Sequence, residues 1–108
     1  MKMKHYKELT KENFKDEILN KSKLSVIDFW ASWCGPCQML APVFESVSEE
    51  FEDVDFYKVN ADSEPDLVMQ FGVKSIPTLT FIKDNKTVDI SIGLISKEEL
   101  LDFIKRNK

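Results

Sequence analysis

The sequence is poor in residues that several classes of protein require. It has two cysteines, one histidine and three glycines among 108 residues. A zinc site needs about four ligands, so two cysteines and His5 are too few to build one within the chain. The glycine-rich fingerprint of dinucleotide-binding proteins is absent as well. We therefore expect no metal, no nucleotide and no other organic cofactor.

Net charge and long hydrophobic runs are also scarce. Fifteen Lys and Arg stand against nineteen Asp and Glu, giving a net charge of -4 at pH 7, too weak a field to hold a nucleic acid or an anionic membrane. No stretch approaches the roughly 18 apolar residues of a membrane span. The N-terminus lacks the apolar core and cleavage site of a signal peptide. We expect no nucleic-acid or membrane partner and a cytoplasmic location, although a mature secreted protein would look the same.

What remains is an ordinary globular composition. Hydrophobic residues make up 43% and charged residues 31% of the chain, and the charges alternate in sign instead of forming blocks. No repeat, linker or low-complexity tract marks a boundary. The sequence predicts one domain over residues 1–108, acting as a monomer.

Apolar runs alternate with helical patterns along the chain, in the order βαβαβαββα. The predicted strands lie near Tyr6 and at residues 24–30, 54–60, 78–83 and 87–92. The predicted helices are one capped by Thr10, one over residues 35–51 with Met39 on its buried side and Pro42 in its interior, one over 65–71, and one with a capping box at Ser96 and Glu99. A turn at Asp84 and Asn85 joins the last two strands.

Both cysteines fall in the stretch FWASWCGPCQ, residues 29–38. Cys34 lies between a buried strand and the start of a helix, where unsatisfied N–H groups and the helix dipole favour a thiolate. Cys37 follows one helical turn later, within reach of a disulfide bond with Cys34. Gly35 and Pro36 suit the first turn between them. Cys34 is therefore predicted to attack and Cys37 to resolve the mixed disulfide.

Three other interpretations of the pair are open. A structural disulfide that closes so short a loop would constrain the unfolded chain little. Metal binding would need ligands from a second chain, and the pair could also be chemically idle. Redox chemistry is favoured over all three.

Two segments, VIDFWASWCGPCQMLAP and SIPTLTFIKDNKTV, resemble the two landmarks of the thioredoxin family, and the similarity runs from about residue 9 to 104. The resemblance implies an α/β fold with a central five-stranded mixed sheet flanked by four helices. It also implies a general protein disulfide reductase that acts on disulfide-containing proteins. Its partner would be a thioredoxin reductase, which would use NADPH to restore the dithiol.

Asp28 is a carboxylate inside an apolar strand, where burial is costly and raises the pKa. By the resemblance it lies beneath Cys37, and we expect it to accept the Cys37 proton, through water, during resolution. The alternative is a side chain on a solvated sheet edge. Lys58 matches the family's lysine near this acid, where it would tune the titration of Asp28.

The resemblance also implies a cis peptide bond between Ile76 and Pro77 that faces the two sulfurs. Such a proline would present the Ile76 backbone to an extended substrate and keep metal ions off the thiolates. A strand-entry proline is the simpler alternative. A shallow, uncharged docking surface is expected around the sulfurs, formed by Trp33, Gly35, Pro36, Ile76, Pro77, Ile92, Gly93 and Leu94.

Three positions depart from the usual family pattern: Gln38 replaces a frequent lysine, Ser75 a common glycine, and Asp84-Asn85 an Asn-Gly type of turn. These changes bear on rate and partner choice. Two other functions also fit the same fold: a disulfide oxidase or isomerase of an oxidising compartment, and a binding subunit without a redox role.

Overall fold

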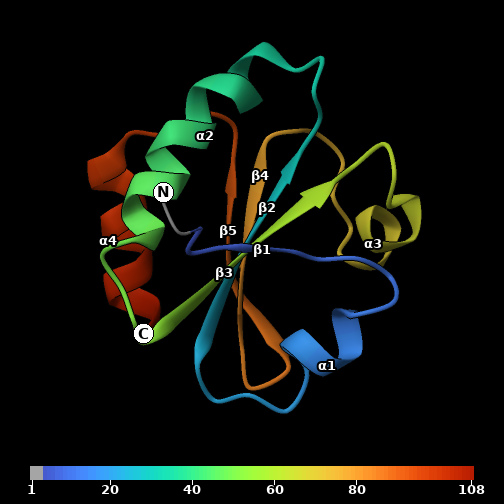
Figure 1. Ribbon diagram of the computed structural model, residues 1–108. Helices are drawn as coiled ribbons and strands as arrows, with labels where there is room; N and C mark the ends of the chain where they lie inside the picture. Colours follow the sequence, from blue (N-terminus) through green and yellow to red (C-terminus); the bar gives the residue numbers. More distant parts are fainter. Residues whose placement is uncertain (1–3) are drawn as a thin grey trace.

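The computed structural model describes residues 4–108, so the first three residues of the predicted domain lie outside the described part. The predicted order of elements is confirmed (Figure 1). The strands are β1 (Lys7–Glu8), β2 (Leu24–Trp30), β3 (Val54–Asn60), β4 (Thr78–Lys83) and β5 (Lys86–Ile92). The helices are α1 (Phe14–Ile18), α2 (Gly35–Ser48), α3 (Pro65–Gln70) and α4 (Lys97–Asn107).

The strands form one mixed sheet in the order β1-β3-β2-β4-β5. β1, β3 and β2 run parallel, whereas β4 is antiparallel to β2 and β5 is antiparallel to β4. β2 is thus the central strand, and every residue from Leu24 to Phe29 is buried. A strand covered on both faces is expected to read as a continuous apolar run, as LSVIDFW does except at Ser25 and Asp28.

Helices cover both faces of the sheet, with α2 and α4 on one side and α1 and α3 on the other (Figure 1). The first core packs side chains of α2 and α4, such as Phe44 and Ile104, against Val26 and Phe81 of the sheet. The second packs Phe14, Ile18 and Leu67 against the opposite face. The alternation of β2 residues between the two cores fixes which side chains face α2, and Asp28 is among them.

Helix ends differ from the predictions by a few residues. α1 begins at Phe14, because the Thr10 hydroxyl accepts from the Asn13 amide at 3.3 Å and the Asn13 side chain accepts from the Thr10 amide at 2.8 Å, which closes a turn before the helix. α2 is continuous across Pro42, as predicted, but ends at Ser48. Met39 was expected on the buried side and is 63% exposed. Within residues 4–108, no helix is long and apolar enough to cross a bilayer.

The predicted turn and cap are confirmed. Asp84 and Asn85 both have positive φ, 52° and 65°, the conformation of a two-residue hairpin turn. At α4, the Ser96 side chain accepts from the Glu99 amide at 3.1 Å and the Glu99 carboxylate accepts from the Ser96 amide at 3.0 Å. The turn fixes the start of β5 at the sheet edge remote from the site, and the cap fixes the start of α4, which follows the end of β5 at the site.

Candidate active site

The topology brings four loops to one edge of the sheet. β2 and β3 are parallel, so their carboxyl ends meet there. β4 starts at the same edge, since Thr78 pairs with Phe29, and β5 ends there, since Ile92 pairs with Thr78. The segments that follow β2, β3 and β5 and the segment that precedes β4 therefore surround a single point.

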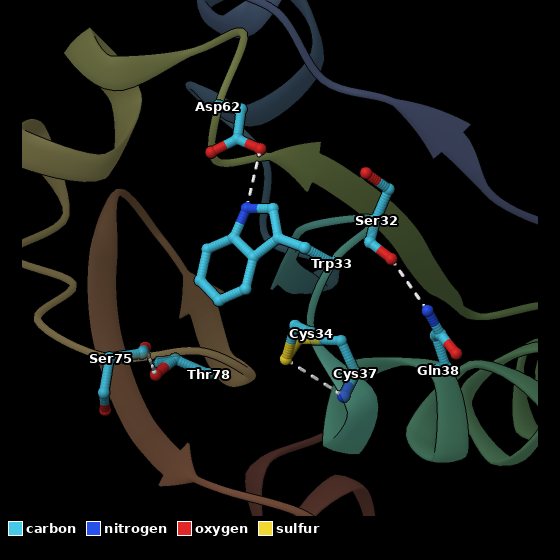
Figure 2. The surroundings of a disulfide bond; sticks show 8 residues. All are labelled: Ser32, Trp33, Cys34, Cys37, Gln38, Asp62, Ser75 and Thr78. Atoms are coloured by element: carbon cyan, nitrogen blue, oxygen red, sulfur yellow. Dashed lines mark hydrogen bonds between the residues drawn. A yellow bond between two sulfur atoms is a disulfide. The ribbon is translucent and has the colours of Figure 1, made fainter.

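Cys34 and Cys37 form a disulfide bond at this point, with their Cα atoms 5.2 Å apart. Cys34 is the N-cap residue of α2, and its Sγ accepts a hydrogen bond from the Cys37 amide at 3.2 Å (Figure 2). The first turn of α2 carries no acidic residue. The sulfur therefore sits where a helix N-terminus stabilises negative charge, with no carboxylate on that turn to oppose it.

Trp33 is exposed beside the disulfide. Its side chain is 69% exposed, and its Nε1 donates to Asp62 Oδ2 at 2.9 Å. In the view of Figure 2 the indole lies between Asp62 and Cys34. Trp33 is thus not a core residue, and the hydrogen bond fixes the orientation of a large apolar surface in solvent.

Ile76 and Pro77 lie at the site just before β4; Ile76 is half-buried, whereas Pro77, expected on the docking surface, is buried. The peptide bond between them is cis, as predicted, and the Pro77 carbonyl accepts from the Gly93 amide at 2.8 Å. Ile76 packs against the buried cluster of Ala31, Cys34 and Cys37. Among residues 4–108, no backbone group pairs with the amide or carbonyl of Ile76. These groups are free to pair with an added extended segment.

The remaining predicted docking residues lie around the same edge. Gly35 and Pro36 are exposed at the start of α2, and Ile92 is 71% exposed at the end of β5. Gly93 has a φ of 93°, which a residue with a side chain would adopt only under strain. Leu94 is 44% exposed beyond it.

Asp28 is buried in the central strand and is only 1% exposed, so it does not lie on a solvated edge. Burial raises the pKa of its carboxyl to about 7, against a smaller opposing effect of Lys58. Its Oδ1 has no hydrogen-bond partner in the described chain. A cavity of about 120 Å³ is lined by Asp28, Lys58, Cys37 and neighbouring side chains of β2 and α2. That volume accommodates water, whose share of the liquid is about 30 Å³ per molecule.

Lys58 lies next to Asp28 in the β2–β3 register, as the resemblance implied, but its ion-pair partner is a different acid. Its Nζ is 3.0 Å from Glu45 Oε2 on α2. The ammonium also lies 4.7 Å from the centre of the Tyr6 ring. Lys58 therefore shares the cavity with Asp28 while its charge is directed to Glu45.

Two residues of the site were not predicted from the sequence, Asp62 and Glu45. Asp62 follows the carboxyl end of β3, and that position was the signal that could have found it. Glu45 lies on α2, and its place in the helix carries no sequence signal for an ion pair with Lys58 of β3. Of the unusual positions, Gln38 donates to the Ser32 carbonyl at 2.7 Å, and the Ser75 carbonyl accepts from the Thr78 hydroxyl at 2.7 Å (Figure 2).

The side chains of the site suit the chemistry of a dithiol–disulfide pair. Within the described part of the chain, no group of three or more His, Cys, Asp or Glu side chains could hold a metal ion. His5 is exposed in the segment before β1, far from Cys34 and Cys37 in the sequence. The site combines a disulfide bond, a buried carboxyl and an exposed apolar rim.

Comparison with known proteins agrees with this arrangement. The family model described as Thioredoxin matches residues 5–106. A thioredoxin of Chlorobaculum thiosulfatiphilum is 45% identical over 93 residues, which cover 85% of this chain and 86% of that protein. A thioredoxin of Rickettsia typhi is 41% identical over 100 residues, covering 92% and 95%. The crystal structure of Malassezia sympodialis thioredoxin (Mala s 13) superposes with a TM-score of 0.87 at 32% identity, covering 99% of this chain and 94% of that one.

Proposed function

The chain belongs to the thioredoxin family and is a thiol-disulfide oxidoreductase with a disulfide reductase role, and from this premise we propose how its residues divide the reaction. The Cys34 thiolate attacks a target disulfide, forms a mixed disulfide and releases one target thiolate. Cys37 then attacks Cys34 Sγ, which releases the second target thiolate. The target gains two electrons, and the protein is left with the Cys34–Cys37 disulfide.

The observation that carries this assignment is the position of Cys34 at the N-cap of α2. A negative charge on the Cys34 sulfur is stabilised there by the helix dipole and by the Cys37 amide, which donates a hydrogen bond of 3.2 Å to Sγ. Cys37 lies in the first turn of the helix, is 3% exposed and lines the cavity that it shares with Asp28. This supports Cys34 as the attacking sulfur and Cys37 as the resolving one.

Asp28 is proposed as the acceptor of the Cys37 proton. The two residues line the same cavity, which is large enough for a water molecule to relay the proton. The pKa of Asp28 is raised by burial to about 7, so the carboxyl gains and loses a proton near neutral pH. Lys58, on the same cavity, adjusts this titration.

Target proteins are proposed to dock on the apolar rim. Trp33 and Ile92 offer exposed apolar area, and the unpaired backbone of Ile76 offers hydrogen bonds that read no side chain. Gly35, Pro36 and Gly93 complete the surface around the disulfide, whereas Pro77 is buried. Such contacts do not depend on the partner's side chains, so they suit any protein with an accessible disulfide and select no particular sequence.

We further propose that the chain works in the cytoplasm as a single-domain monomer and that a thioredoxin reductase restores its dithiol. Support comes from the family, whose reaction leaves the protein oxidised after each turnover. The chain needs no cofactor of its own for that step, because two electrons move between sulfur pairs.

A trapping experiment tests the assignment of the cysteines. Reduced Cys37→Ser protein, mixed with a disulfide-containing target, should accumulate a covalent one-to-one complex that dithiothreitol releases. Reduced Cys34→Ser protein should accumulate none. A complex that forms with Cys34→Ser and not with Cys37→Ser would reverse the two roles.

Stopped-flow measurement of mixed-disulfide resolution tests Asp28. Asp28→Asn should slow resolution at pH 7, within the typical 10²- to 10⁴-fold range of general acid-base catalysis. The difference should shrink at higher pH, where hydroxide in the solvent competes with Asp28 for the Cys37 proton. An unchanged rate at pH 7 would remove Asp28 from the mechanism.

A further inference from the structure

The Lys58 side chain has two carboxylates within its surroundings and pairs with only one. Lys58 and Asp28 are direct neighbours in the parallel β2–β3 register and line the same cavity. The Lys58 Nζ nevertheless lies 3.0 Å from Glu45 Oε2, and Asp28 Oδ1 has no hydrogen-bond partner among residues 4–108. Lys58 therefore forms its ion pair with Glu45 on α2 and not with Asp28 on β2.

Burial explains why this pairing is the favourable one. Asp28 is 1% exposed, and an ion pair formed there would take both charges out of water, at a cost of several kcal/mol per ion. The Glu45 side chain is 45% exposed, so its carboxylate stays hydrated while it binds the ammonium. Two aromatic rings hold the Lys58 ammonium in this position, Tyr6 at 4.7 Å and Phe44 at 5.9 Å from the ring centres.

We propose that Glu45 is a positioning residue that holds the Lys58 ammonium away from Asp28 and so keeps the Asp28 carboxyl free to accept a proton. The inference deepens the proposed function, on which its consequence for catalysis rests. Without Glu45, the ammonium's nearest buried acid is Asp28. A close pair between the two would hold Asp28 ionised and hydrogen-bonded to Lys58 instead of facing Cys37.

The charged groups near Asp28 come from two elements. β3 contributes Lys58, and α2 contributes Glu45, while Cys37 of α2 lines the same cavity as Asp28. On the opposite side β4 presents Leu79, which is apolar and fully buried. Lys4 and His5 line a separate hollow together with Glu45. Of these charges, Lys58 lowers the pKa of Asp28, and Glu45 raises it by direct repulsion, so the test has to separate that repulsion from the positioning of Lys58.

The experiment is an NMR titration of the Asp28 side-chain carboxyl in the disulfide form, where neither cysteine titrates. Glu45→Gln should lower the pKa of Asp28 by about one pH unit or more, because an opposite charge within reach of an acid has an effect of that size. Glu50→Gln is the matched control. Glu50 is 44% exposed and pairs with Lys97 at 2.9 Å, so its replacement removes the same charge and a similar ion pair elsewhere. It should leave the Asp28 titration in place.

A second background separates positioning from simple repulsion between Glu45 and Asp28. In a Lys58→Met protein no ammonium remains to be released, so Glu45→Gln should lower the pKa of Asp28 much less, through loss of the direct repulsion between the two carboxylates alone. A shift of equal size in both backgrounds would mean that Glu45 acts on Asp28 as a distant negative charge and would overturn the inference. No shift in either background would overturn it as well.

This outcome is distinguishable from failure of the proposed function. The titration reports where the Lys58 charge goes and needs no substrate. The resolution rate of Asp28→Asn reports whether Asp28 accepts the proton. In the stopped-flow assay, Glu45→Gln should move the pH dependence of resolution to lower pH and Glu50→Gln should not.

Discussion

At the scale of single residues, the site contains one carboxyl whose surroundings disfavour its charged form. Asp28 occupies the central strand of the sheet among apolar side chains, with one oxygen unpaired in the described chain. A folded protein tolerates such a group only if other interactions offset its cost. The proposed benefit is a proton acceptor whose pKa lies near neutral pH, on the cavity that Cys37 also lines.

The cost of Asp28 should be visible as a pH-dependent stability. The pKa of the carboxyl is about 7 in the folded protein and about 3.9 in the unfolded chain. Between these values unfolding releases a proton, so the free energy of unfolding falls as the pH rises from about 4 to 7. The difference of about three pH units corresponds to roughly 4 kcal/mol.

Asp28→Asn removes this penalty. In urea titrations of the disulfide form, the variant should match the parent near pH 4 and exceed it by a few kcal/mol at pH 8. Asp16→Asn, on the exposed side of α1, controls for the loss of one negative charge. A difference between Asp28→Asn and the parent that is the same at pH 4 and pH 8 would contradict the raised pKa.

The properties of some residues of the site could be predicted from the sequence and those of others could not, for a physical reason. The raised pKa of Asp28 was predictable, because an acid in an apolar strand is desolvated whatever surrounds it. The ion pair of Lys58 with Glu45 was not, since it depends on how α2 lies across β3. The same holds for the bond between Trp33 and Asp62, which joins two loops 29 residues apart in the chain.

At the scale of elements, the helix termini do most of the positioning. α2 begins at the disulfide, and α4 begins at Lys97, five residues after Ile92, the last residue of β5. The capping box at Ser96 satisfies two amides that would otherwise lack partners at the start of α4. The start of this helix in turn supports the loop that carries Gly93 and Leu94.

Ser96→Ala should lower the free energy of unfolding by about 1 kcal/mol, the usual cost of losing a cap. Chemical denaturation measures the change, and Ser22→Ala, at an exposed serine in the loop before β2, is the control. The rate of disulfide exchange with a small disulfide reagent should stay unchanged. Equal stability of the two variants would show that the cap contributes nothing.

Element types were predictable and element ends less so. Strong local signals, such as the capping box and the two-residue turn at Asp84 and Asn85, gave the right positions. The start of α1 was misjudged because Thr10 and Asn13 close a turn on each other before the helix begins. Met39 was misassigned to the core because helical spacing says little about residues at the margin of a buried face.

At the scale of the whole molecule, the site is a product of topology. Strands that are distant in sequence end or begin at one edge, and this gathers the segments around residues 33, 62, 76 and 92. The mixed five-stranded sheet was implied by the family resemblance and not by periodicity, and the order of its strands was not predicted, because strand pairing is set by long-range contacts. The shared edge explains how a small domain gathers the proposed docking surface from four loops.

The docking surface should matter for protein substrates and not for small ones. Ile92→Ser should lower kcat/KM for a protein disulfide about tenfold, because docking would bury much of a side chain worth roughly 1.5–3 kcal/mol when fully covered. Its rate with a small aromatic disulfide should change little. Val88→Ser, on the same strand but nearer the hairpin turn, is the control. Equal losses with both kinds of substrate would argue against a docking role for Ile92.

The most direct test of the account is the reduction potential of the Cys34–Cys37 pair, measured by equilibration with defined thiol buffers and quantification of both forms. For this two-electron couple 30 mV corresponds to about 1.4 kcal/mol, so small differences are resolved. We predict a potential more negative than that of glutathione, as required of a protein that donates electrons to target disulfides. A potential well above that of glutathione would make the protein an oxidant or isomerase, and the direction of electron flow assigned to it would be wrong.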